Sequence, residues 1–239
     1  MPKCIHGSTL KCIAAATMFI DHFAASFIES SWLAGERFFT YPFYLTLRLI
    51  GRMAFPIYAF LLVEGYRHTG NVWRYLGRLT LFGLVSELPF DLAFYRQPLY
   101  WGHQNVFFTL ALGLLALWLW DRSVNTQAVG STLLRYLLAL LSLAAVSGAA
   151  YYLRTDYAQW GILTVAAFYL FSESEWKRGA VSACALLASS ELEAAGFVDY
   201  LLFHFYSGQR GRQSKYFFYA FYPAHLLLLS LVCKLVFRV

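Results

Sequence analysis

The chain has 239 residues, of which 59% are hydrophobic and only 13% are charged, and its mean hydropathy is +0.52. A soluble domain has about 45 to 50% apolar and about 25% charged residues, so this composition excludes an ordinary soluble protein and indicates a polytopic membrane protein. The net charge of +6 does not indicate nucleic-acid binding, because the basic residues fall between apolar runs. The four cysteines are scattered and form no C-x-x-C pair, so we expect no metal site.

Seven apolar runs are long enough to cross a bilayer, which takes about 20 residues. They fall at about 9–29, 43–66, 73–95, 104–120, 132–152, 156–171 and 216–236. The stretch 179–206 holds two shorter apolar runs, which Glu191 and Glu193 separate. We therefore expect an all-α transmembrane helical bundle that forms a single domain over residues 1–239. It should have about eight to nine membrane segments, including a short or broken pair near 179–206.

Basic residues are concentrated in alternate loops between these runs. Short loops rich in lysine and arginine stay in the cytoplasm, which predicts a cytoplasmic N-terminus. To return the basic residues before the last span to the cytoplasm, the stretch 179–206 must cross twice or re-enter without crossing. The basic residues in these loops are Arg67, Arg74, Arg78, Arg122, Arg135, Lys177, Arg178, Arg210, Arg212 and Lys215.

Two ionisable residues, Asp21 and His22, lie in the middle of the first apolar run. A charge there costs about 2.5 to 3.5 kcal/mol on insertion scales, so such a pair indicates a functional site. Lys11 precedes His22 by eleven residues, which places the two within about 20° of one helix face and about 16 Å apart along the axis. This arrangement suits a long anionic substrate that enters from the cytoplasm. Asp21 points about 100° away from His22 and must address a neighbouring helix.

The second span carries Arg48, Arg52 and Glu64 together with Pro56. Because Pro56 cannot donate to the carbonyl of Arg52, we expect a kink there, with Arg52 on the wall of a polar cavity. Arg48 lies one turn earlier on a similar face. Glu64, near the cytoplasmic end, either lines the pocket or pairs with one of the arginines that follow the span.

The third span ends with Glu87 and Asp91 one turn apart, with Pro89 between them. The expected partners of these acids are His22 and the two arginines of the second span, in either a catalytic site or a structural ion-pair network.

Three further polar residues occur at span ends or next to a proline. Asn105 opens the fourth span, where it either caps the helix or lines the pocket. Asp156 begins the sixth span, where N-capping explains it. His225 follows Pro223 in the last span and is either a packing residue or a site residue.

Five sequence blocks in this order resemble the TraX family. The first reads Leu-Lys-x-Ile-Ala-x-x-x-Met-x-Ile-Asp-His and the second reads Arg-x-x-x-Pro-Ile-x-Ala-Phe-Leu-Leu-Val-Glu-Gly. Ser-Glu-x-Pro-Phe-Asp, Gln-Asn-Val-Phe-Phe-Thr-Leu and Phe-Tyr-Pro-x-His-Leu follow. The blocks stand at 10–22, 52–65, 86–91, 104–110 and 221–226. In the loop at 206–211, Ser207 stands where the family more often has asparagine.

This resemblance implies an integral acetyltransferase of the bacterial cytoplasmic membrane, which moves acetyl from cytoplasmic acetyl-CoA to a pilin N-terminal amine or to a sugar or other cell-envelope acceptor. Related membrane acyltransferases use a basic residue and a first-helix histidine at the spacing of Lys11 and His22. His22 would act as general base or acyl-carrying nucleophile, and Arg52 would stabilise the oxyanion or a CoA phosphate. The other expected catalytic residues are Asp21, Glu87 and Asp91, the cofactor-binding ones are Lys11, Arg48, Arg67, Arg74 and Arg78, and the substrate pocket holds Asn105, Glu64 and His225.

Two other classes of function fit the same residues. Acids, histidines and proline-broken helices in the membrane also mark transporters and proton relays, which would move substrate or protons without acyl-CoA. A non-catalytic assembly factor for an envelope or conjugation machine would tolerate loss of His22. In every case the expected surroundings are membrane lipids, and no motif specifies the acceptor or the oligomeric state.

Overall fold

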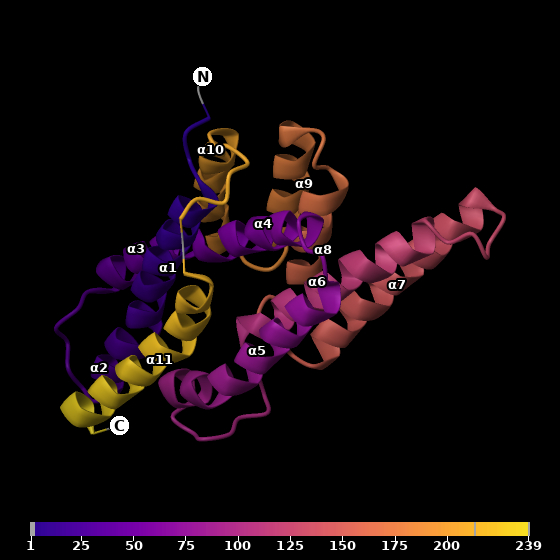
Figure 1. The fold of residues 1–239 in the computed structure, drawn as a ribbon. Coiled ribbons are helices and arrows are strands. Elements are labelled where there is room, and N and C mark those ends of the chain that lie inside the picture. Colours follow the sequence, from indigo (N-terminus) through magenta and orange to yellow (C-terminus); the bar gives the residue numbers. More distant parts are fainter. Residues whose placement is uncertain (1–2, 213, 239) are drawn as a thin grey trace. The chain divides into compact units, whose positions relative to one another are not determined.

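The computed structural model describes residues 3–212 and 214–238, and Figure 1 shows its helices in chain order. Within these residues the secondary structure is helical, with two isolated backbone bridges, Ile5 to Tyr206 and Gln104 to Thr155. The expected all-α class is therefore confirmed.

The chain divides into two compact units. The first unit comprises Met1–Tyr58, Leu84–Trp101 and Ser190–Val239, and the second comprises Ala59–Gly83 and Gly102–Ser189. The helices of the first unit are α1 (Gly7–His22), the π-helix η1 (Phe23–Ile28), α2 (Glu29–Leu33), α3 (Tyr41–Gly51), the 3₁₀ helix η2 (Glu191–Val198), α10 (Asp199–His204) and α11 (Lys215–Phe237). Those of the second are α6 (Val106–Val124), α7 (Thr132–Tyr152), α8 (Ala158–Leu170) and α9 (Glu175–Leu187), while α4 (Ala54–Arg67) and α5 (Val72–Phe94) each have residues in both units.

The second unit is a helical bundle with an apolar core. Ala116 of α6, Val146 and Ala150 of α7 and Ile162 of α8 form one buried cluster. The two alanines let these helices approach closely, which is how transmembrane helices gain packing energy when lipid is as apolar as their own side chains. Serine and asparagine caps begin three of these helices, as Asn105 does for α6.

Five helical segments among the described residues are long and apolar enough to cross a membrane. They are Gly7–Leu33, Tyr41–Arg67, Val106–Val124, Thr132–Tyr152 and Tyr216–Phe237. The chain is thus a membrane protein, but the expected count of eight to nine segments is not confirmed. Helix α5 has 23 residues but carries two arginines and two acids along its length. The stretch 179–206 comprises most of α9, then η2 and α10, so it is broken as predicted.

The second span is interrupted one turn before Pro56. Helix α3 ends at Gly51 and α4 begins at Ala54, so the interruption falls at Arg52 and Met53. The Arg52 carbonyl is the one that Pro56 cannot bond, so the expected interruption is confirmed, as a complete break of the helix. Pro56 itself lies in the first turn of α4, where a missing backbone N–H costs little. The break frees Arg52 from the regular helix and allows its side chain to reach two other segments.

Candidate functional site

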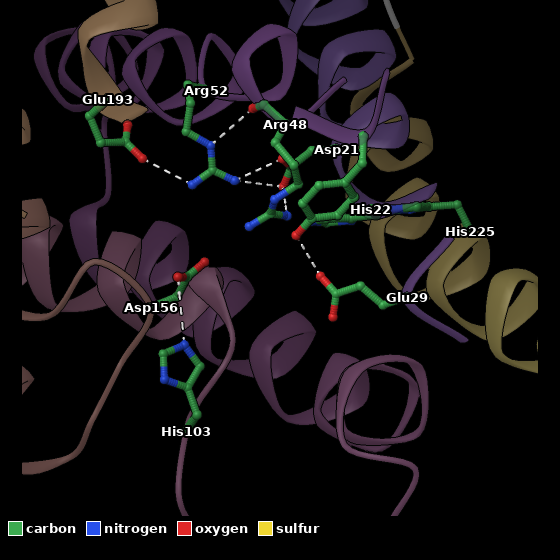
Figure 2. A network of polar contacts seen from close by, with 10 residues as sticks. Asp21, His22, Glu29, Arg48, Arg52, His103, Asp156, Glu193 and His225 are labelled. Carbon is green, nitrogen blue, oxygen red and sulfur yellow. Dashed lines mark hydrogen bonds and ion pairs between the residues drawn. The ribbon is translucent and has the colours of Figure 1, made fainter. Parts of the chain in front are cut away.

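Asp21 forms ion pairs with two arginines, Arg48 of α3 and Arg52 of the break that follows it, as Figure 2 shows. Arg48 Nη1 donates to Asp21 Oδ2 at 3.0 Å, and Arg52 Nη2 lies 2.8 Å from both carboxylate oxygens. Gly51 permits this approach, because a Cβ atom there would overlap the Asp21 side chain. Only about a tenth of the Asp21 side chain is exposed. The prediction that Asp21 addresses a neighbouring helix is confirmed.

Glu193 is the second carboxylate of this network, and sequence reasoning missed it. Its Oε1 accepts a hydrogen bond from Arg52 Nη1 at 3.0 Å, and the residue is buried. Arg52 Nε also donates to the Arg48 carbonyl at 3.3 Å, so every guanidinium nitrogen of Arg52 already donates within the network. The available signal was the Glu191-Leu-Glu193 interruption of an apolar stretch, since a buried acid in such a place needs a cation.

His22 forms a pair with His225 of α11 (Figure 2). His22 Nδ1 lies 2.7 Å from His225 Nε2, and His225 Nδ1 lies 2.7 Å from the Phe221 carbonyl oxygen. A carbonyl only accepts, so His225 Nδ1 carries the proton and, in the neutral pair, His225 Nε2 accepts from His22 Nδ1–H. This network assigns the free lone pair of His22 to Nε2, which is the atom that a general base or nucleophile would use.

Aromatic side chains surround the imidazole of His22. The ring centroids of Phe94 and Tyr222 lie 5.2 and 5.8 Å from that of His22, both in edge-to-face geometry. His22 is only partly buried. His22 is also the last residue of α1 before the π-helix η1, and π-helical turns inside longer helices are frequent at functional sites.

Lys11 and His22 face the same partner helix. Lys11 Nζ lies 5.7 Å from the ring centroid of Phe218, and His22 contacts His225 two turns later on the same helix, α11. Because α1 is regularly α-helical from Gly7 to His22, the eleven-residue spacing is preserved. The predicted shared face of Lys11 and His22 is confirmed.

Asp91 has a partner that the sequence did not predict. Its Oδ2 accepts a hydrogen bond from the Tyr100 backbone N–H at 2.7 Å, which fixes the turn after α5. This contact is structural, and the catalytic roles expected for Glu87 and Asp91 stay predictions.

The three arginines expected to hold CoA phosphates lie in the second unit. Arg67 is 4.0 Å from Glu64 and its guanidinium stacks on the Tyr169 ring, so Glu64 pairs with a following arginine, one of the two alternatives. Arg78 stacks on the ring of Tyr75. Arg74 lies in the first turn of α5, where Asn71 caps its backbone N–H.

Asn105 caps a helix instead of lining a pocket. Its Oδ1 accepts from the Phe107 N–H at 3.1 Å and its Nδ2 donates to the Gly83 carbonyl at 2.8 Å, and the residue is fully buried. Asp156 pairs with His103 at 3.6 Å in the same unit (Figure 2). We therefore assign Asn105 a structural role.

Comparison with known proteins agrees with the sequence blocks. A family model described as TraX protein matches residues 6–233. The chain is also similar to a probable fimbrial assembly protein FimC, serogroup H1, of Dichelobacter nodosus, with 32% identity over 256 aligned residues that cover 92% of each chain. No solved structure matches. The match along almost the whole chain shows that this protein belongs to the TraX family.

Proposed function

We propose that this membrane protein transfers an acetyl group from acetyl-CoA to a pilin N-terminal amine or to a sugar or other cell-envelope acceptor. The main support for the proposal is the His22–His225 pair, because it leaves His22 Nε2 with a free lone pair. The rings of Phe94 and Tyr222 pack against this imidazole. The name of the Dichelobacter relative, a fimbrial assembly protein, supports an acceptor among fimbrial components.

In this mechanism His22 Nε2 acts as the general base. The acceptor nitrogen or oxygen attacks the thioester carbonyl carbon while its proton moves to Nε2. The new bond to the acceptor forms, the C–S bond breaks, and the proton on Nε2 passes to the leaving thiolate to give the free CoA thiol. An alternative order has Nε2 attack first and carry the acetyl group to the acceptor. His225 holds the Nδ1–H of His22 and fixes the direction of its lone pair in both routes.

The two arginines differ in what they can offer to the reaction. Arg52 is occupied by Asp21, Glu193 and the Arg48 carbonyl, so we assign it to positioning. Arg48 donates from Nη1 to Asp21, and its charge lies within electrostatic range of His22. Its remaining N–H groups suit the oxyanion of the tetrahedral intermediate. Lys11, at the end of α1 predicted to be cytoplasmic, would bind a phosphate of the donor. For Arg67, Arg74 and Arg78, which lie in the second unit, a role in donor binding stays a prediction.

The test is acetyl transfer by the purified protein with radiolabelled acetyl-CoA. We expect transfer to a peptide with the N-terminus of a pilin, or to an envelope glycan, and its loss in His22→Ala by about a hundredfold or more, the usual contribution of a general base. His68→Ala is the matched control, because His68 is exposed and lies in the second unit. Full turnover by His22→Ala, or no interaction of the wild type with acetyl-CoA, would contradict the proposal.

The competing function is a non-catalytic assembly factor, which the name of the relative equally supports. Genetic complementation separates the two. A strain that lacks this protein should remain deficient in acceptor modification when His22→Ala is supplied at wild-type level in the membrane. Full complementation by that variant would favour the assembly role.

A further inference from the structure

The start of α1 and the residues just before it are bound to a loop that lies about two hundred residues later. Four backbone hydrogen bonds join them: Ile5 N–H to Phe205 O at 3.0 Å, Ser207 N–H to Ile5 O at 2.9 Å, Gly7 N–H to Gln209 O at 2.8 Å, and Ser8 N–H to Arg210 O at 2.9 Å. We call residues 205–211 the docked loop. His6 Nδ1 and Ser207 Oγ, 3.1 Å apart, add a side-chain contact.

Two glycines allow the docked loop to lie close to the start of α1. Gly211 has a φ of +70°, and a Cβ atom there would overlap Ser8 Oγ. A Cβ atom at Gly7 would lie 3.3 Å from the Arg210 carbonyl oxygen. The backbone of Arg210 is therefore held against the first turn of α1 by contacts that do not involve its own side chain.

This docking brings two positive charges together. Ser8, which binds the Arg210 carbonyl, lies three residues before Lys11 on the same side of α1, and the charge of Arg210 acts on the Lys11 ammonium. Among the described residues, Lys11 has no acidic partner, and Lys11 Nζ lies over the Phe218 ring. Two cations brought together by backbone contacts repel each other and create a strong local field for an anion.

We propose that Lys11 and Arg210, held together by the docked loop, bind a phosphate group at the N-terminal end of α1. Arginine provides a planar fork that matches phosphate oxygens and lysine a mobile point charge. The site lies about 16 Å along α1 from His22, so a phosphate held here suits a donor whose acyl group reaches the imidazole. If the phosphate belongs to a CoA-type donor, this inference rests on the function proposed above. An anionic lipid headgroup also presents a phosphate, and its binding would not depend on that function.

The first experiment measures binding of CoA and of S-acetylpantetheine, which lacks the phosphates, to the protein in a neutral detergent. We expect Arg210→Gln to raise the Kd for CoA about tenfold or more and to leave that for S-acetylpantetheine unchanged, because a hydrogen bond to a charged group is lost. Gly211→Ala, which displaces the docked loop, should have the same selective effect. Arg212→Gln is the matched control, since this exposed arginine lies outside the loop.

The second experiment measures the thermal midpoint in vesicles with and without phosphatidylglycerol. If the site binds a lipid headgroup, phosphatidylglycerol should raise the midpoint of the wild type and of Arg212→Gln but not of Arg210→Gln, while CoA binding is unaffected by the substitutions. If the wild type binds no CoA, the proposed function fails and this lipid result still decides whether the phosphate site exists. If Arg210→Gln changes neither the CoA preference nor the response to phosphatidylglycerol, the phosphate site is overturned.

Discussion

His22 Nδ1 lies 2.7 Å from His225 Nε2, and the two residues are 203 positions apart in the chain. The pair joins the first long helix of the protein to the last. It also leaves the free lone pair of His22 on Nε2, because the Phe221 carbonyl fixes the proton of His225 and His225 in turn fixes the proton of His22.

The pairing predicts that His225 acts through His22. We expect His225→Leu to lower kcat for acetyl transfer about tenfold to a hundredfold, in the range seen when an orienting partner of a histidine is removed. His225→Gln should retain more activity, because the side-chain carbonyl of glutamine can still accept from His22 Nδ1–H. The kcat–pH profile should shift in His225→Leu, because the Nδ1–H of His22 loses the group that accepts its hydrogen bond. A purely structural role for His225 would change protein yield or thermal midpoint and leave this profile in place.

Removal of Arg52 should destabilise the protein strongly. Arg52→Met leaves Asp21 and Glu193 without their shared cation, which typically costs about 3 to 5 kcal/mol when one member of a buried pair is lost. Arg52→Lys should rescue little, since an ammonium group cannot match a planar fork. Thermal unfolding in detergent measures both, with the exposed Arg37→Met as control. The double variant Arg52→Met/Glu193→Gln should lose less free energy of unfolding than the sum of the two single variants. If the two losses simply add, the ion pair between Arg52 and Glu193 is contradicted.

Gly51 predicts a packing effect that can be separated from helix propensity. Gly51→Ala places a methyl group where the Asp21 side chain lies, and overpacking of this kind costs about 1 to 3 kcal/mol. Gly77→Ala, inside α5 with nothing within 4 Å of the added Cβ, should instead stabilise by about 0.5 to 1 kcal/mol. The thermal midpoints of the two variants are compared in one detergent. If both substitutions shift the midpoint in the same direction, Gly51 is not a contact point.

The sequence predicted those parts of the site that lie along one helix. Helical periodicity placed Lys11 and His22 on one face and turned Asp21 towards a neighbour, and both relations hold in the structure. Periodicity carries no information about which distant helix supplies the partner. For that reason the contact with His225 and the role of Glu193 were found only in three dimensions.

The break in the second span shows what sequence reasoning could and could not supply. Pro56 has no N–H for the Arg52 carbonyl, and the helix is interrupted at Arg52 and Met53. The sequence did not show that the interruption is complete, with Pro56 in the first turn of a separate helix α4. It also did not show that Asp21 and Glu193 bind the Arg52 side chain at this interruption.

Asp199 predicts an unusual pH dependence of stability. This first residue of α10 lies outside the five candidate membrane spans and is fully buried, and among the described residues neither carboxylate oxygen has a hydrogen-bond partner. Burial, together with the nearby charge of Glu193, raises the pKa of Asp199 from 3.8 to about 9. The folded protein thus binds this proton more tightly than the unfolded chain, so the contribution of Asp199 to the free energy of unfolding falls as pH rises from about 4 to about 9.

Asp199→Asn should remove this contribution. We expect the thermal midpoint of the variant to exceed that of the wild type by about 2 °C or more at pH 8, because about 1 kcal/mol moves the midpoint of a chain of this size by about 2 to 4 °C. At pH 4.5, where the wild-type carboxyl is protonated in the folded state and partly so in the unfolded one, the difference should shrink. Glu36→Gln, at an exposed acid, controls for the change in net charge. A difference between Asp199→Asn and the wild type that is the same at both pH values would show that Asp199 is ionised in the folded protein.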